Sequence, residues 1–233
     1  EGSSINQTIT VASGNLIANA ESFGAGVENS SSVELIGGKL TQKISGGDII
    51  ISGNVTSAVD NLNGEVKNLG NLLLSGTLSQ NITGTGTTQI DQNLALTTGA
   101  AVSGTLDLNG GRLNLAEETA KYTNYSLGTL KGSGTMQIDF DGTNTDSLTV
   151  ESSEGGTIVI TSLHGFNKGQ AEVSAKTIIS GASNLTLAIS EELQRAYNET
   201  VKDEGHYIAD AIDSYAVWSD SFKNRYYEIE TGL

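Results

Sequence analysis

The chain has 233 residues, a net charge of −15, no cysteine and no proline, with 36% hydrophobic and 17% charged residues. This charge disfavours binding to nucleic-acid phosphates, anionic membranes and sulfated glycans, since all three need clustered Lys and Arg. No apolar run approaches the roughly 20 residues of a membrane-spanning helix. The absence of Cys favours a cytosolic protein or a bacterial surface protein that stays unlinked during export. With neither signal peptide nor initiator Met, the chain is expected to be a piece of a longer precursor.

The first 115 residues repeat a short apolar run that ends in glycine. Its variants are "VELIGG" (33–38), "DIIISG" (48–53), "NLLLSG" (71–76), "LALTTG" (94–99) and "TLDLNGG" (105–111). Gly53, Gly76 and Gly99 are equally spaced, and Gly37 precedes Gly53 by a shorter interval. A loose period of roughly 16–23 residues, with two or three short strands per period, predicts a stacked β-solenoid. A Greek-key sandwich is the alternative, but it explains the recurring phrase less well.

Alternation of apolar and polar residues supports the assignment of strands. Leu106 and Leu108 alternate with polar residues before a Gly-Gly turn, and Leu113 and Leu115 do so after it. Asparagine tolerates left-handed backbone, so five asparagines are predicted at turns: Asn61, Asn63, Asn68, Asn71 and Asn109.

The C-terminal third has a different composition. Residues 190–205 are the best helix candidate, with Ser190 as N-cap and Gly205 as the stop. Residues 215–232 are predicted to form a hairpin with bulky side chains. Because an open solenoid end exposes backbone edges and core, this aromatic-rich region is predicted to be a cap. Seven of the twelve aromatic residues lie here: Tyr197, Tyr207, Tyr215, Trp218, Phe222, Tyr226 and Tyr227.

Three stretches resemble the C-terminal passenger region of bacterial autotransporters of the pertactin and AIDA-like adhesin type. In that family a phrase of the form L-x-G-x-G-x-hydrophobic leads into a strand, and a polar turn and an Asp-x-Leu-x-Val strand follow. Residues 127–160 resemble this order, with Asp146, Leu148 and Val150 in the second strand. Residues 77–115 are similar to the passenger repeats, and residues 215–233 to the last hairpin, or autochaperone region. Residues 163–182 and 190–205 depart from the family pattern and are expected to form an insertion on the cap.

The resemblance implies an all-β chain folded as a right-handed parallel β-helix (solenoid) with a C-terminal hairpin-rich cap. Residues 1–125 would be passenger coils, and residues 126–233 would be continuous with them and form the last coils and the autochaperone-like cap. The resemblance also implies export through an outer-membrane β-barrel translocator to the surface of a Gram-negative bacterium. Passengers of this family include self-associating adhesins and some proteases and lipases.

Residues 134–150, "GTMQIDFDGTNTDSLTV", contain four oxygen-bearing side chains close together: Asp139, Asp141, Asn144 and Asp146. Calcium prefers six to eight oxygen ligands, so a calcium site is one interpretation. The glycine stands fourth rather than sixth, however, and Val150 occupies the twelfth position, where a calcium loop has a bidentate Glu. Since Asp141-Gly142 is a strong turn signal, a structural turn is the preferred interpretation.

The sequence shows no catalytic phrase. His164 and His206 are the two histidines, and neither stands near a G-x-S-x-G elbow or a similar nucleophile motif. Zinc is disfavoured for want of Cys and His pairs, and the glycine-rich segments lack the Lys-Ser/Thr of a phosphate loop. The prediction is a chain that is not an enzyme, with no catalytic, cofactor-binding or metal-binding residues assigned.

Three functions remain open. The first is an adhesin passenger that binds itself on neighbouring cells, or a host glycan or matrix protein, through ladders of Asn, Thr and Ser. The second is a stalk that presents a head located N-terminal to residue 1. The third is a hydrolase of glycans or esters, since paired carboxylates are hard to exclude in an acidic chain.

Overall fold

The computed structural model describes residues 5–141, 144–165 and 178–193, and this part of the chain is all-β. Two short 3-10 helices, η1 (Ala20–Ser22) and η2 (Val59–Asn61), interrupt the strands. In the described ranges, no helix is long and apolar enough to cross a membrane. The strands are β1 (Ile9–Val11), β2 (Asn15–Asn19), β3 (Val27–Asn29), β4 (Ser32–Leu40), β5 (Ile44–Ala58), β6 (Leu62–Asn68), β7 (Asn71–Leu78), β8 (Asn81–Thr83), β9 (Thr87–Leu96), β10 (Ala101–Asp107), β11 (Arg112–Asn114), β12 (Asn124–Lys131), β13 (Gly134–Asp139), β14 (Ser147–Ser153), β15 (Gly156–His164), β16 (Ile179–Ser180) and β17 (Leu185–Ile189).

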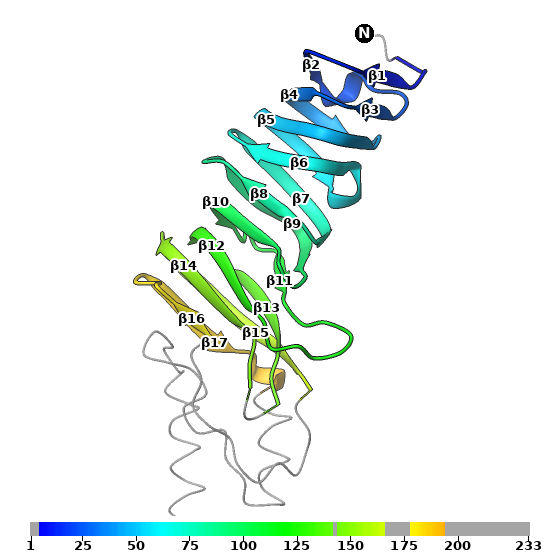
Figure 1. Cartoon of the computed structure of the whole chain (residues 1–233). Helices are drawn as coiled ribbons and strands as arrows, with labels where there is room; N and C mark the ends of the chain where they lie inside the picture. Colours follow the sequence, from blue (N-terminus) through cyan, green and yellow to red (C-terminus); the bar gives the residue numbers. More distant parts are fainter. Residues whose placement is uncertain (1–4, 142–143, 166–177, 194–233) are drawn as a thin grey trace, which may run out of the picture.

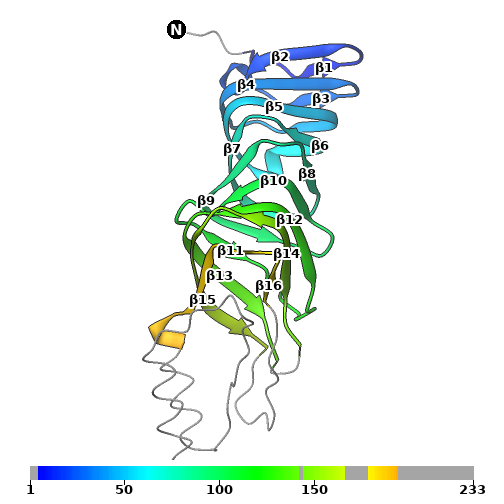
Figure 2. The same cartoon turned by 90° about the vertical axis from the view of Figure 1, so that its left-hand side faces the viewer.

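Every ladder that joins two of these strands is parallel. Most strands pair with the strand two places further along the chain, as β2 does with β4 and β12 with β14. Figures 1 and 2 show the result from two sides: the strands lie in layers, in chain order, from β1 and β2 down to β17. The described part of the chain is therefore elongated.

The sequence separation between ladder partners gives the length of each layer. Val33 pairs with Ile49 in the first half of the stack, and Val102 pairs with the more distant Leu127 in the second half. Near the C-terminal end of the described chain the separation is longer still, since Leu148 pairs with Ile179. The predicted period of roughly 16–23 residues fits the first layers, whereas longer loops lengthen the later ones.

The core consists of apolar columns that run along the stack. Because side chains alternate between the two faces of a strand, every second residue points inward and meets its ladder partner. Each fully buried aliphatic side chain stabilises the fold by about 1.5–3 kcal/mol. One column passes through seven layers, with every member at most 3% exposed: Val33, Ile49, Val66, Ile82, Val102, Leu127 and Val150.

A column of glycines marks one corner of the stack. Gly53, Gly70, Gly86, Gly104 and Gly128 follow one another, and a Cβ on each of the last four would collide with the carbonyl oxygen of the glycine before it. For Gly86, the Cβ would lie 2.5 Å from the carbonyl oxygen of Gly70. The equal spacing of Gly53, Gly76 and Gly99 is not the repeat of this corner, because Gly76 packs near Val59 and Gly99 faces open space.

Two buried asparagines join successive layers. Asn68, 1% exposed, donates from Nδ2 to the carbonyl oxygen of Thr87 at 3.0 Å and to Oγ1 of Thr88 at 3.2 Å. Its Oδ1 accepts the backbone N–H of Gly70 at 3.1 Å. Asn29 makes the corresponding bonds to the carbonyl oxygens of Gly46 and Asp48 and from the N–H of Ser31. These side chains satisfy backbone groups where the chain turns a corner.

Other predicted features have mixed outcomes. Asn109 has the left-handed backbone expected at a turn, with φ of 50°. The turn prediction is wrong for Asn63 and Asn71, which lie in β6 and β7 at outward positions where a polar side chain reaches solvent. The division at residues 125 and 126 falls inside β12, whose ladders continue both β10 and β14.

The predicted helix begins where expected. Oγ of Ser190 accepts the backbone N–H of Leu193 at 3.2 Å, as an N-cap does, and residues 191–193 are helical. The remainder of the predicted helix, His206 and the predicted aromatic cap lie outside the described residues, as does most of the 163–182 segment.

Candidate functional site

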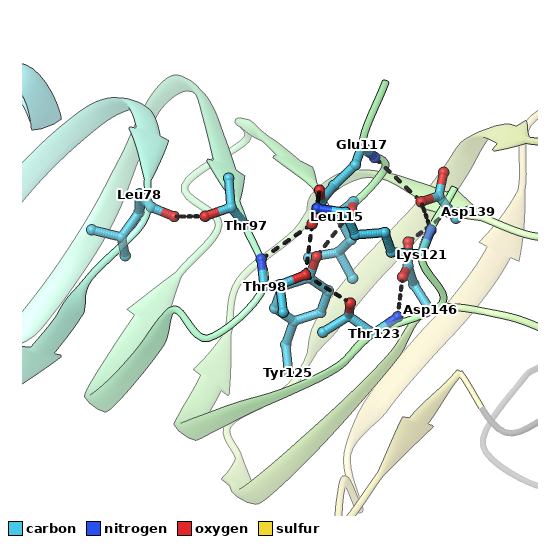
Figure 3. Close-up of polar contacts among 10 residues, drawn as sticks. All are labelled: Leu78, Thr97, Thr98, Leu115, Glu117, Lys121, Thr123, Tyr125, Asp139 and Asp146. Carbon is cyan, nitrogen blue, oxygen red and sulfur yellow. Dashed lines mark hydrogen bonds and ion pairs between the residues drawn. The ribbon is translucent and has the colours of Figure 1, made fainter. Parts of the chain in front are cut away.

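Asp139 and Asp146 are buried carboxylates, 0% and 1% exposed; Asp139 ends β13 and Asp146 directly precedes β14. Oδ1 of Asp146 accepts the backbone N–H of Thr123 at 2.8 Å, and Oδ2 accepts that of Asp139 at 2.6 Å. Oδ2 of Asp139 accepts the backbone N–H groups of Glu117 and Lys121 at 3.3 and 3.1 Å. Figure 3 shows both carboxylates directed at the 116–123 loop. They fasten this loop to the stack.

Asp141 and Asn144 form the turn that the sequence predicts. Phe140 and Thr145 are bridged antiparallel, and the N–H of Asp141 donates to the carbonyl oxygen of Asn144 at 3.1 Å. The N–H of Asn144 donates to Oδ1 of Asp141 at 2.6 Å, and its Nδ2 donates to Oδ2 of Asp141 at 3.0 Å. Residues 142–143, including Gly142, lie outside the described chain.

The four oxygen-bearing side chains do not converge on one point. Asp146 directs both oxygens at backbone N–H donors, Asp139 directs one at backbone N–H donors and the other at His164, and Asp141 directs its own at Asn144. Among the described residues, no group of three or more His, Asp or Glu side chains could hold a metal ion. The described geometry therefore fits a structural turn next to two carboxylates that hold the 116–123 loop.

Burial governs the titration of this cluster. It raises the pKa of Asp146 to about 6, with the hydrogen bonds from Asp139 and Thr123 opposing the rise. Burial likewise raises the pKa of Tyr125 to about 12, and its hydroxyl donates to the carbonyl oxygen of Leu115 at 3.2 Å. On the rim, a hydrogen bond from Lys121 lowers the pKa of the Glu117 carboxyl. Asp146 therefore takes up a proton at a higher pH than a free carboxyl group does, and Glu117 and Lys121 present a charged pair to solvent.

His164 is the one sequence candidate for general base chemistry in the described chain. Its Nδ1 lies 2.6 Å from Oδ1 of Asp139, so the carboxylate orients the ring. Nucleophilic catalysis also needs a hydroxyl beside the imidazole. Within residues 5–141, 144–165 and 178–193, no Ser, Thr or Tyr hydroxyl hydrogen-bonds to His164.

A second candidate site is an outward face of β4, β5, β7, β9, β10, β12 and β14, built from two rows of ladder partners. All its members are exposed or half-buried. We call it the ladder face and define it by twelve residues. The first row is Asn54, Asn71, Thr87, Thr105, Thr129 and Ser152, and the second is Lys39, Thr56, Leu73, Gln89, Asp107 and Lys131.

Neighbouring layers are linked by hydrogen bonds on this face. Nδ2 of Asn71 donates to Oδ1 of Asn54 at 2.8 Å, and the hydroxyls of Thr129 and Ser152 lie 2.8 Å apart. Such links hold the polar side chains at the spacing of about 4.8 Å between adjacent strands. The face is a regular array of donors and acceptors.

The ladder face carries little charge although the chain carries −15. Its charged members are Lys39, Asp107 and Lys131, and Nζ of Lys131 lies 3.8 Å from Oδ2 of Asp107. By contrast, Asp48 and Glu65 are direct partners on the outward side of β5 and β6. The ladder face is thus a surface on which two acidic chains can approach each other.

No sequence motif marks the 116–123 loop or the ladder-face charges. Asp139 and Asp146 form a local cluster in the sequence, but their partners lie in a loop that precedes β12 in the chain. The ladder-face residues recur at the layer spacing, which is visible only once the register is known. Neither the family models nor the curated proteins nor the solved structures contain a match to this chain.

Proposed function

We propose that this chain is the passenger of a bacterial cell-surface adhesin, without enzymatic activity, which joins cells by binding a second copy of itself. The observation that supports the proposal is the ladder face, a regular polar surface of low charge on a chain with a net charge of −15. Attachment to a host glycan or matrix protein through the same face is included in the proposal.

The proposed fold is a right-handed parallel β-helix of the autotransporter passenger type. Support comes from the exclusively parallel ladders between the described strands, the pairing of most strands with the second one after them, and the apolar columns. The phrases in residues 77–115 and 127–160 resemble such passengers. On this proposal the precursor carries an outer-membrane barrel, and the chain is displayed at the surface of a Gram-negative cell.

Binding through such a face is weak for each contact and strong in sum. A hydrogen bond between two exposed polar groups contributes roughly 1 kcal/mol or less, because each replaces bonds to water. Many copies on two facing cells multiply these contributions through avidity. A modest affinity between single chains is sufficient for cell aggregation.

Salt acts on this mode of binding mainly through the net charge of the two chains. Two chains of −15 repel each other at long range, and the Debye length falls from about 30 Å at 0.01 M salt to about 8 Å at 0.15 M. We therefore expect self-association to strengthen as salt rises over this range.

The test is sedimentation velocity of the full chain over a wide concentration range at both salt concentrations. The variant Asn71→Glu/Thr105→Glu adds two charges to the ladder face and is expected to abolish the dimer. The control, Ser126→Glu/Thr149→Glu, adds two charges to the outward side of β12 and β14, off the ladder face, and is expected to dimerise. Wild-type chain that stays monomeric at every concentration and salt would contradict self-association.

The elongated stack in Figure 1 favours a second candidate, a stalk that carries a separate head. A stalk needs length and stiffness but no binding face. A monomeric wild-type chain would favour this candidate, and binding assays would then move to glycans and matrix proteins.

A further inference from the structure

One more charged side chain, that of Glu21 in η1, lies in the layer before Lys39. Asn19 is the ladder partner of Gly37, and Glu21 packs beside Gly38, where a Cβ would lie 3.0 Å from its Cγ. Glu21 is exposed and occupies the layer before Lys39. The ladders align Lys39, Thr56, Leu73, Gln89, Asp107 and Lys131. With Glu21 counted as the preceding layer, the row has seven positions.

The charges of this row complement their own reversed order. Leu73 is the central position, with three positions on each side. Reversal about Leu73 places Asp107 opposite Lys39, Lys131 opposite Glu21, and Gln89 opposite Thr56. Every charged residue thereby meets one of opposite sign, and the uncharged residues meet one another.

We propose that two copies of this chain bind through their ladder faces in antiparallel orientation, about a two-fold axis that runs along the strand direction at Leu73. Lys39 of each copy then faces Asp107 of the other, and Glu21 of each faces Lys131 of the other. This inference rests on the proposed self-association and adds the geometry and the residues of the interface. The partner is a second copy of this chain.

The alternative alignments are unfavourable. A two-fold axis along the length of the stack places each layer opposite the same layer. Over the second row it brings Lys39 to Lys39 and Asp107 to Asp107, and midway between the rows it brings Asp107 only to Thr105, without an ion pair. An antiparallel shift by one layer brings Leu73 opposite Gln89 and Lys39 opposite Lys131. Like charges in contact disfavour a wrong register more than ion pairs strengthen the right one, so the row selects one alignment.

The remaining surface suits the same arrangement. The first row contributes six uncharged side chains, each with a hydroxyl or an amide, and they can exchange hydrogen bonds in either direction. Asp107 lies near Lys131 of its own chain and would lie near Lys39 of the other, so the ion pairs form an alternating network.

Charge reversal provides the test. Lys39→Asp and Asp107→Lys each convert both symmetry-related pairs into like-charge pairs, so each variant alone is expected to self-associate roughly tenfold more weakly than wild type. In an equimolar mixture of the two variants, the mixed dimer regains opposite charges across the interface only if position 39 of one copy faces position 107 of the other.

The geometry of the mixture therefore decides the readout. In the mixed dimer, the substituted position 39 of one copy faces the substituted position 107 of the other, and the two unsubstituted residues, Asp107 and Lys39, face each other as in wild type. Both pairs regain opposite charges across the interface. The mixed dimer is expected within about threefold of the wild-type dissociation constant.

Lys43→Asp is the matched control, because Lys43 is exposed but lies outside both rows. It changes the net charge as Lys39→Asp does and is expected to weaken the dimer far less. Circular dichroism and thermal melts verify that every variant is folded. The readout is the dissociation constant from sedimentation and from titration of a fluorescently labelled chain.

Cysteine cross-linking supplies an independent readout, since the chain has no cysteine. Leu73→Cys lies on the proposed axis and is expected to give a disulfide-linked dimer under mild oxidation. Leu69→Cys, also at the surface, is expected to remain monomeric.

The outcomes distinguish the antiparallel register from self-association in general. If wild type dimerises but the mixture is no tighter than either variant alone, the antiparallel register is wrong and self-association stands. If wild type does not dimerise at all, both fail. Rescue in the mixture together with cross-linking at Leu73→Cys supports both.

Discussion

The backbone N–H of Asp139 donates a hydrogen bond of 2.6 Å to Oδ2 of Asp146, and the N–H of Asp146 donates one of 2.8 Å to the carbonyl oxygen of Asp139. The two residues close the 140–145 turn from the inside. Both carboxylates also reach the 116–123 loop. Turn, loop and stack therefore form one unit, and its stability can be measured.

The stability of the chain is expected to depend on pH through Asp146. Burial raises its pKa from 3.8 to about 6, so between these values the folded chain keeps a proton that the unfolded chain has lost. The contribution of Asp146 to the unfolding free energy is full below about pH 4, falls as the pH rises to about 6, and is level above. The decrease is at most roughly 3 kcal/mol, at about 1.4 kcal/mol per pKa unit.

Urea unfolding of wild type and Asp146→Asn from pH 4 to pH 7.5 measures this contribution. The variant removes the titrating group, so groups common to both chains cancel in the difference. The stability of wild type relative to the variant should decrease between pH 4 and pH 6. A difference that rises over this window would show that the carboxylate is stabilised rather than penalised by its site.

Asp139→Asn is expected to release the 116–123 loop. The amide that replaces one carboxylate oxygen is a donor, so at least one of the N–H groups of Glu117 and Lys121 loses a charged acceptor. The side chain of Lys121 is 54% exposed, so trypsin can cleave after it once the loop opens. Cleavage at this site is expected to accelerate at least about fivefold, a local cost of about 1 kcal/mol or more. Glu118→Gln, an exposed change in the same loop, should leave the rate unchanged.

Gly86→Ala is expected to destabilise the stack. Its Cβ would lie 2.5 Å from the carbonyl oxygen of Gly70, a backbone atom that moves only if two layers separate. A cost of about 1–3 kcal/mol follows from such overpacking. Gly26→Ala is the control, because its nearest neighbour would be the carbonyl oxygen of Lys43 at 3.5 Å. Urea midpoints give both values, and equal stability of the two variants would refute the close approach at the glycine column.

Asn68→Ala is expected to cost about 2–3 kcal/mol. The change leaves the N–H of Gly70 and the carbonyl oxygen of Thr87 without this partner inside a corner of the stack. Asn63→Ala, an exposed change in the same strand β6, should alter the unfolding free energy by less than about 0.5 kcal/mol. Comparable losses for the two variants would mean that the buried amide is not what joins the layers.

Calcium is expected to leave the melting temperature unchanged. Both oxygens of Asp146 and one of Asp139 already accept backbone N–H donors, the other oxygen of Asp139 contacts His164, and those of Asp141 bond to Asn144. A ligand at 100 times its dissociation constant would add about 2.7 kcal/mol to stability. Thermal melts in millimolar calcium and in EDTA should therefore coincide. A rise of several degrees that EDTA reverses would restore the calcium interpretation of residues 139–146.

Local patterns were sufficient to predict the class of fold. Alternating leucines in the sequence predict which residues of β10 and β11, and of the positions just after them, point inward. All four of them are buried: Leu106, Leu108, Leu113 and Leu115. The N-cap at Ser190 and the turn at Asp141 are likewise properties of a few consecutive residues. These features could be read directly because alternation, capping and turn chemistry act between near neighbours in the chain.

The register between layers was decided by the tertiary structure. Gly53 stacks with Gly70 rather than with Gly76, because layer lengths vary with the loops and close backbone approach selects which glycines align. The partners of Asp139 and Asp146, and the charge order from Glu21 to Lys131, depend on the same register.

The sequence by itself determined that this chain forms short strands with one apolar face. Which polar residues share a surface was decided only when those strands stacked. The physical reason is that contacts between layers join residues a whole layer apart in the chain, as Val33 and Ile49 or Leu148 and Ile179 are, and the loops set that distance differently in each layer.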